Sequence, residues 1–263
     1  MKPISLSERL QAVAALVTVG NRVCDVGCDH GFIPIYLVEQ GISPYVLAMD
    51  VKSGPLGAAK EHIAERGLEA VIETRLSDGL HNYNAKEADT LVCAGMGGRL
   101  MMRILSDDRD KTESFRELIL QPQSELEQFR AWLRGQGYRI TDENMIEEEG
   151  KFYPMMRVET GDAVDSGCID RPGYRMQPGE IYNNKCDRLN DDVLCKLGDR
   201  YGPVLLRSKN STLTAFLRRE ERIYEEILSE LQAQNLSDDK RKRRHAEISE
   251  LLEECRMALD IMT

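Results

Sequence analysis

The sequence of 263 residues contains no Cys-x-x-Cys pair, although it has seven cysteines. An odd number of cysteines without that spacing argues against a disulfide scaffold and against a zinc ribbon. The four histidines lack metal-ligand spacing, so we expect no metal. No apolar run approaches the ~18–20 residues that span a bilayer, and residues 1–8 lack the apolar core of a signal peptide. We therefore expect a cytoplasmic protein with no membrane partner.

Acidic residues outnumber basic ones, since 45 Asp and Glu residues against 35 Lys and Arg residues give a formal net charge of −10 and an isoelectric point of about 5.1. This balance argues against a surface that binds nucleic acid everywhere, but it leaves room for a local basic patch. Hydrophobic residues make up 41% of the chain, and glycine and proline are near ordinary usage. The composition therefore predicts a folded protein with a sizeable core.

Strand and helix patterns alternate along the first 160 residues. A helix is expected over residues 5–16, with Ser5 as its N-cap and Glu8 completing a capping box. Further helices are expected up to residue 39 and over residues 57–66, 101–105 and 124–136. Strands are expected over residues 22–26, 45–50, 71–76, 89–94 and 117–121, and a closing antiparallel pair over residues 139–146 and 153–159. The alternation predicts an α/β Rossmann-like domain, whose mostly parallel sheet ends in an antiparallel edge.

The remaining chain has a different character. Residues 161–192 are rich in Gly, Asp, Asn and Pro and predict a long loop or an inserted lid. From residue 208 onward, apolar residues recur in a 4-3 rhythm in two stretches, with a turn and an N-cap expected over residues 236–239. This pattern predicts two antiparallel helices, a coiled-coil hairpin. We thus expect a domain over residues 1–160, an irregular connector over 161–207 and the helical hairpin over 208–263.

The strongest local motif is Asp25-x-Gly27-x-Asp29-x-Gly31, between the first strand and the following helix. Its glycines would let the backbone pass close to a ligand. Its carboxylates suit a ligand with an ammonium group better than a pyrophosphate, and the spacing departs from G-x-G-x-x-G. An ordinary glycine turn after a buried strand is the alternative.

Three more loops follow strands and would meet at the same sheet edge. Asp50, which ends the second strand, could accept both hydroxyls of a ribose, or could only cap the strand. Asp78 in Ser77-Asp78-Gly79 could accept the exocyclic amine of adenine, or could belong to a plain turn. Residues 94–98 (AGMGG) would leave space for a transferring methyl group, or form a flexible loop. Suitable residues in all four loops favour a nucleoside-containing cofactor.

These loops resemble the motifs of class I methyltransferases. Together with residues 7–10 (SERL), 120–123 (LQPQ) and 150–153 (GKFY), and with the expected hairpin, the sequence resembles the bacterial TrmK family, the tRNA (adenine-22-N1)-methyltransferases. The resemblance is close over residues 1–160 and resumes near residues 201–206. It implies S-adenosyl-L-methionine as cofactor, tRNA as partner and methylation at N1 of an adenine. The cofactor contacts implied are Arg9, Asp25, Gly27, Asp29, His30, Gly31, Asp50, Val51, Asp78, Gly79, Gly95 and Met96.

Methylation of adenine N1 needs no strong base, because N1 has its own lone pair, but it creates a cationic base. Asp29 is our candidate to stabilise that charge, although it could instead hold the methionine ammonium. Tyr153 could stack on the adenine, or could be core. Arg9 could contact the cofactor carboxylate or an RNA phosphate, or be an ordinary surface arginine. We interpret His30 as a turn-stabilising residue, and Cys93 as core.

The dense basic run in the sequence is a candidate RNA-binding surface. Arg218, Arg219 and Arg222 on the preceding helix could face it across the hairpin, and the alternative is a solvated helix turn balanced by neighbouring glutamates. The residues of the run are Lys240, Arg241, Lys242, Arg243 and Arg244.

Two other functions stay open from the sequence. A small-molecule methyltransferase would share the cofactor loops without needing a basic hairpin. A non-catalytic nucleotide-binding module could use the hairpin to dock a partner protein. A homo-oligomer is also possible, because a hairpin of this kind closes on itself or pairs with another.

Overall fold

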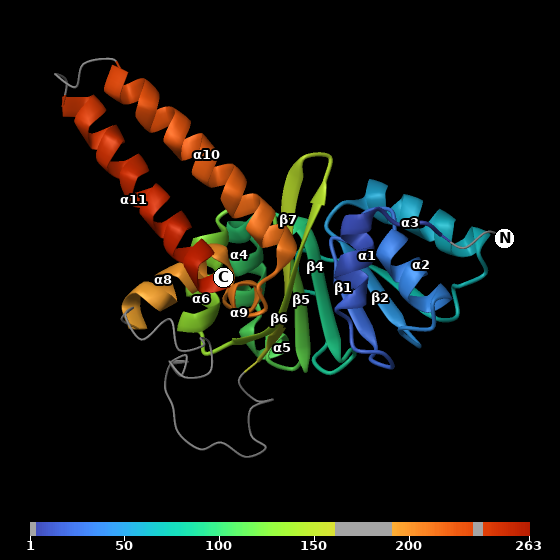
Figure 1. Cartoon of the computed structure of the whole chain (residues 1–263). Helices are drawn as coiled ribbons and strands as arrows, with labels where there is room; N and C mark the ends of the chain where they lie inside the picture. The colour runs from blue at the N-terminus through green and yellow to red at the C-terminus, as the bar shows by residue number, and fades with distance from the viewer. Residues whose placement is uncertain (1–3, 161–190, 234–238) are drawn as a thin grey trace. The chain divides into compact units, whose positions relative to one another are not determined.

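The computed structural model describes residues 4–160, 191–233 and 239–263 (Figure 1). The chain divides into two compact units, Met1–Tyr174 and Arg175–Thr263. The loop or lid expected over residues 161–192 lies almost wholly outside the described residues, as does most of the turn expected at 236–239.

The first unit is built on one seven-stranded sheet, in the order β3-β2-β1-β4-β5-β7-β6. The first five strands pair in parallel, and β7 runs antiparallel to both of its neighbours, β5 and β6. The expected Rossmann-like sheet with an antiparallel end is therefore confirmed. The strands are β1 (Val23–Val26), β2 (Val46–Asp50), β3 (Ile72–Leu76), β4 (Thr90–Met96), β5 (Glu117–Pro122), β6 (Arg139–Glu148) and β7 (Lys151–Glu159).

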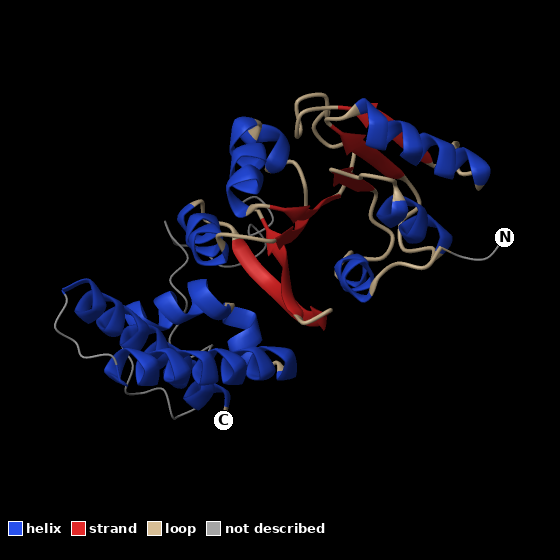
Figure 2. Ribbon diagram, turned by 90° about the horizontal axis from the view of Figure 1, so that it is seen from above, coloured by secondary structure: helices blue, strands red, loops and turns tan. Residues whose placement is uncertain are grey.

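Helices cover both faces of this sheet (Figure 2). Alternate residues of a strand point to opposite faces, so Leu91 packs with one helical layer and Val92 with the other. One layer contains α1 (Glu8–Ala15), α2 (Phe32–Glu39) and α3 (Ser53–Glu65). The other contains α4 (Gly98–Asp107) and α6 (Leu126–Gly135), with the short α5 (Arg109–Thr112) between them in the chain.

Two local expectations are corrected at turns. The N-cap of α1 is Ser7, whose hydroxyl accepts the backbone N–H of Leu10, so the capping box on Ser5 is wrong. The strands of the β6–β7 hairpin are longer than expected, because only Glu149 and Gly150 turn the chain. Both have a positive φ, of 52° and 74°, which suits the twist of a two-residue hairpin turn.

The described part of the second unit is helical: α8 (Asp191–Tyr201), α9 (Pro203–Arg207), α10 (Ser211–Ala233) and α11 (Asp239–Met262). The irregular connector expected over 161–207 is therefore wrong for residues 191–207. Leu194, Leu197 and Tyr201 recur at helical spacing and are buried, a signal that the polar segment before them obscured.

The expected pair of antiparallel helices is confirmed in α10 and α11, which lie side by side (Figure 1). Leu217 and Cys255 are both fully buried, and the Cys255 thiol lies 3.1 Å from the Leu217 carbonyl oxygen. Farther along, Gln232 contacts His245 at 3.5 Å between their Nε2 atoms. These contacts fix the register of the hairpin. Its coiled-coil character stays a prediction.

Candidate active site

A cavity of about 610 Å³ opens where the loops after β1, β2, β3 and β4 meet. This is the carboxyl edge of the parallel strands, where open α/β sheets bind ligands, and the volume lies in the usual range for cofactor sites. Of the twelve residues expected to contact the cofactor, ten line it: Arg9, Asp25, Gly27, Asp29, Asp50, Val51, Asp78, Gly79, Gly95 and Met96. His30 and Gly31 are not among its lining residues.

Asp25 is the most deeply buried carboxylate of this cavity, with 2% of the residue exposed. It lies inside β1, where both neighbouring strands shield it from water. Burial, with a smaller contribution from the nearby Asp50 carboxylate, raises the pKa of Asp25 from 3.8 to about 7. A positively charged group entering the cavity would favour the ionised form of Asp25.

Asp50 ties together the loops that follow β1 and β2. Its Oδ2 accepts the backbone N–H of Asp29 at 3.2 Å, and its Oδ1 accepts that of Lys52 at 2.8 Å. The strand-end cap suggested by the sequence therefore exists. A carboxylate oxygen accepts more than one hydrogen bond, so this cap leaves Asp50 able to bind hydroxyl groups in the cavity.

Backbone geometry explains the glycines of the first loop. Gly27 has a φ of +78°, and a Cβ there would lie 2.1 Å from Cε of Met96. Gly31 has a φ of +75°, and its Cβ would lie 3.0 Å from Cβ of Ala59 on α3. The absence of a side chain at Gly31 thus lets the start of α2 pack closely against α3. At Gly27 it leaves room for the Met96 side chain in the wall of the cavity.

Asp29 has an unfavourable backbone conformation in this loop. It has a φ of +50°, which is uncommon for a residue other than glycine, and its side chain is 70% exposed. Its Oδ1 lies 3.7 Å from Nε2 of His30. The left-handed turn therefore presents the Asp29 carboxylate at the solvent side of the cavity, while Asp25 lies at its floor.

Arg103 is a cavity residue that the sequence analysis missed. Its Nη2 donates to Oδ1 of Asp78 at 2.8 Å, and both side chains are more than half exposed. Arg103 lies on α4, and the rotation of α4 about its axis decides that this side chain points toward the loop after β3. Other lining residues that were missed include Lys52, Leu100 and Ile104, whereas Ser77 and Gln123 stand in the quoted motifs without an assigned role.

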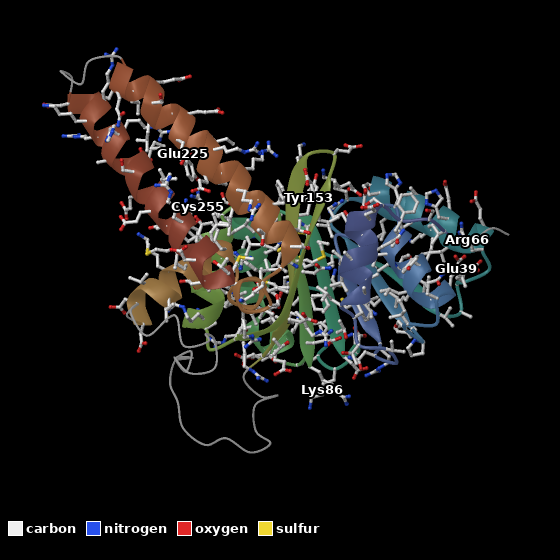
Figure 3. The ribbon with its side chains drawn as sticks, viewed as in Figure 1. Glu39, Arg66, Lys86, Tyr153, Glu225 and Cys255 are labelled. Carbon is white, nitrogen blue, oxygen red and sulfur yellow. The ribbon has the colours of Figure 1, made fainter. Side chains whose placement is uncertain are left out.

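Arg9, Gln121 and Tyr153 form one corner of the site. The fully buried Gln121 accepts from Nη1 of Arg9 at 2.8 Å and from the backbone N–H of Gly95 at 3.1 Å, both through Oε1. The Arg9 guanidinium lies 5.4 Å from the ring centroid of Tyr153, which is labelled on the β6–β7 hairpin in Figure 3. Tyr153 does not line the cavity. It packs against the core and contacts the cavity residue Arg9, and a sequence pattern does not reveal this contact.

Cys93 is core, as expected: it is fully buried in β4, and burial raises the pKa of its thiol to about 12. A protonated thiol is a poor nucleophile. In the part of the chain that the structure describes, no group of three or more His, Cys, Asp and Glu side chains could hold a metal ion. No helix within the described ranges is both long and apolar enough to cross a membrane.

The candidate RNA-binding residues of the second unit are exposed, but they form two groups. Because α10 and α11 are antiparallel, Arg218 and Arg219 lie beside the Leu217–Cys255 contact. The basic run 240–244 lies beyond the Gln232–His245 contact. Fourteen residues separate positions 218 and 232, about 21 Å along a helix. The expectation that the arginines face the basic run across the hairpin is therefore wrong.

The fold and the cavity define a methyltransferase, and residues 6–156 match the sequence family described as "Methyltransferase domain". The chain is 32% identical over 259 residues to tRNA (adenine(22)-N(1))-methyltransferase of Bacillus subtilis (strain 168), covering 97% of this chain and 98% of that protein. The chain belongs to the tRNA (adenine(22)-N(1))-methyltransferase family. The resemblance found in the motifs is thereby confirmed.

Solved structures agree with this assignment. The crystal structure of the B. subtilis m1A22 tRNA methyltransferase TrmK superposes with a TM-score of 0.74 at 29% identity, covering 97% of this chain and 98% of that one. Sp1610 of Streptococcus pneumoniae, solved in complex with S-adenosyl-L-methionine, superposes with a TM-score of 0.73 at 27% identity, covering 97% and 100%. The similarity therefore includes both the sheet domain and the helical second unit.

Proposed function

We propose that this protein transfers a methyl group from S-adenosyl-L-methionine to N1 of an adenine in tRNA, at position 22. The observation that carries the proposal is the similarity to the B. subtilis enzyme over nearly the whole of both chains. The cavity supports it, because its carboxylates match the cofactor's polar groups. Since the acceptor is a tRNA, we place the activity in the cytoplasm.

The residues of the cavity fit this cofactor. The buried Asp25 suits the methionine ammonium, because a cation compensates a carboxylate shielded from water. Asp50 suits the two ribose hydroxyls, and Asp78 suits the exocyclic amine of adenine. Val51 is an apolar wall residue, 58% exposed, and would pack on the adenine ring. When bound, the cofactor supplies a methyl group on a positively charged sulfur.

The chemistry is an in-line displacement. The lone pair of adenine N1 forms a bond to the methyl carbon while the carbon–sulfur bond breaks, and the bonding pair stays on sulfur. The positive charge therefore moves from sulfur to the methylated base. Asp29, exposed at the solvent side of the cavity, is placed to stabilise the charge on the base. Arg9, held by Gln121 and covered by Tyr153, is placed to bind an RNA phosphate or the cofactor carboxylate.

The exposed cations of the second unit would bind phosphates of the tRNA as two separate contacts, Arg218 with Arg219 and the run 240–244. Some of these side chains also pair with acidic neighbours, such as Arg244 with Glu247 at 3.0 Å. Phosphate binding would therefore exchange one ion pair for another.

The experiment is methyl transfer from labelled S-adenosyl-L-methionine to unmodified bulk tRNA, followed by digestion to nucleosides. Label in 1-methyladenosine, lost when position 22 carries another base, is the expected result. Label in a different nucleoside would refute the ring position. No label in any RNA, with the cofactor still binding, would favour a small-molecule acceptor.

A further inference from the structure

Three aromatic rings gather beside the cofactor cavity: His30 from the loop after β1, Phe32 at the start of α2, and His62 on α3. Their centroids lie 5.7 Å (His30–Phe32), 5.4 Å (Phe32–His62) and 6.0 Å (His30–His62) apart. We call these three side chains the ring triad. The cofactor chemistry proposed above makes no use of it.

The rings form a triangle, because the three distances are nearly equal and no ring can lie between the other two. Their planes are within 17° to 37° of one another. The triad is therefore not a single column of stacked rings. One of the rings is also fixed by a polar contact, since Nδ1 of His62 lies 3.0 Å from the backbone oxygen of His30.

Two rings of the triad, His30 and Phe32, are exposed, and the third, His62, is half-buried. Phe32 is one of only a few large apolar side chains that are strongly exposed among the described residues, at 40%. The His30 side chain is 47% exposed. Phe32 lines the cofactor cavity together with Asp29, whereas His30 and His62 do not. The triad therefore begins at the cavity wall and continues away from the cofactor.

We propose that the ring triad is a stacking site for a second nucleobase of the tRNA, one next to the target adenine. To reach the cavity, the target must leave its stack, and its neighbours then lose a stacking partner. Flat rings that are at least partly exposed beside the point of entry offer a replacement, and stacking on aromatic side chains tolerates any base. His62 and Phe32 are thus positioning residues for the acceptor. This inference rests on the proposed function.

The decisive variant is His62→Ala, because His62 lies outside the cofactor cavity. The KM for tRNA should rise at least fivefold, the loss that follows from removing one base–aromatic contact. The kcat at saturating tRNA and the Kd of S-adenosyl-L-methionine should change less than twofold. His62→Phe, which keeps a flat ring, should restore the KM to near the wild-type value. Phe32→Leu keeps an apolar cavity wall but loses the flat ring, so it should also raise the KM.

Each alternative result overturns the inference. If His62→Ala leaves the KM for tRNA unchanged while the wild type methylates adenine N1, the triad binds no base and the proposed function stands. If the Kd of the cofactor rises as much as the KM, the triad only supports the cofactor loop. If His62→Phe fails to restore the KM, the imidazole nitrogen and not the ring face is required. If the wild type methylates no tRNA, the proposed function fails and this inference fails with it.

Discussion

Replacing Asp25 with asparagine tests two effects of the buried carboxylate: its effect on the free energy of unfolding and its effect on cofactor binding. The pKa of Asp25 is raised from 3.8 to about 7, a difference that corresponds to about 4 kcal/mol. The protonated carboxyl group therefore stabilises the fold at low pH. This contribution is fully present below pH 3.8 and is lost as the pH rises through 7.

The magnitude follows from the two pKa values. Between pH 8 and pH 5, the Asp25 contribution to the free energy of unfolding should increase by about 2.5 kcal/mol. An asparagine side chain does not titrate, so the D25N variant should lack this increase. The quantity to compare is therefore the difference in unfolding free energy between D25N and the wild type at each pH. Relative to the wild type, D25N should be more stable at pH 8 than at pH 5 by that amount.

Urea unfolding at pH 5 and pH 8, without cofactor, measures this difference. Asp78→Asn is the matched control, because Asp78 lines the same cavity but its side chain is 62% exposed. The change in this difference between the two pH values should be larger for D25N than for this variant of an exposed carboxylate. A D25N difference that is constant would show that Asp25 is not the buried, proton-binding group described here.

Cofactor binding should have the opposite pH dependence to fold stability and should be weaker at low pH. The ammonium group needs the ionised carboxylate, so the Kd of S-adenosyl-L-methionine should rise by on the order of tenfold from pH 7 to pH 5.5. Above about pH 8 the amine of the cofactor itself loses its proton, so the comparison belongs below that pH. Calorimetry should find weaker binding by D25N with little pH dependence in this range. A wild-type Kd that is flat over this range would contradict the assignment.

Other predictions test packing and RNA binding. Gly31→Ala forces a left-handed backbone and a close contact with Ala59, so urea unfolding should show a loss of about 1–3 kcal/mol; an unchanged midpoint would refute this. Glu143→Ala leaves the buried Arg130 without the carboxylate 2.9 Å from its Nε and should cost about 3–5 kcal/mol, whereas a double change of both residues to apolar ones should recover most of it. Replacing residues 240–244 with glutamines should weaken tRNA binding and flatten its salt dependence while the Kd of the cofactor stays the same; an unaltered salt slope would exclude this run from the RNA contact.

The sheet and most of the cavity could be predicted because their signals are local. Strands β1, β2, β4 and β5 are short, mostly apolar runs, and the cofactor loops begin where the parallel strands end. Parallel pairing then brings Asp25, Asp50 and Asp78 to the same edge without further information. The alternation of strands and helices along the chain, and the carboxylates at the strand ends, carried this part of the prediction.

What could not be predicted depends on direction and register. His30 follows Asp29 in the motif, yet the left-handed turn at Asp29 leaves the His30 ring beside Phe32 and His62, outside the cavity. Arg103 reaches Asp78 only through the phase of α4. To predict these positions one must know the backbone dihedral angles of the turn and the orientation of the helix, and residue types alone do not specify them.

The hairpin shows the same limit over a longer distance. Two basic groups in neighbouring helices were expected to meet, but the register of an antiparallel pair is set by where the turn lies. The side chains that pack between the helices then place the two groups at different heights. A basic run predicts a charged surface. Which residues lie opposite it on the neighbouring helix depends on the register of the two helices.

The position of β7 has a consequence for synthesis on the ribosome. This strand is the last of the sheet to be translated, but it lies between β5 and β6, which are made earlier. Until Glu159 has left the exit tunnel, a nascent chain has an open edge on β5 and no partner for β6. The cofactor loops after β1, β2 and β3 are complete well before that moment. The end of the sheet that carries Tyr153 is therefore the last to close, and a chain stopped at Gly150 lacks an inner strand, not an outer one.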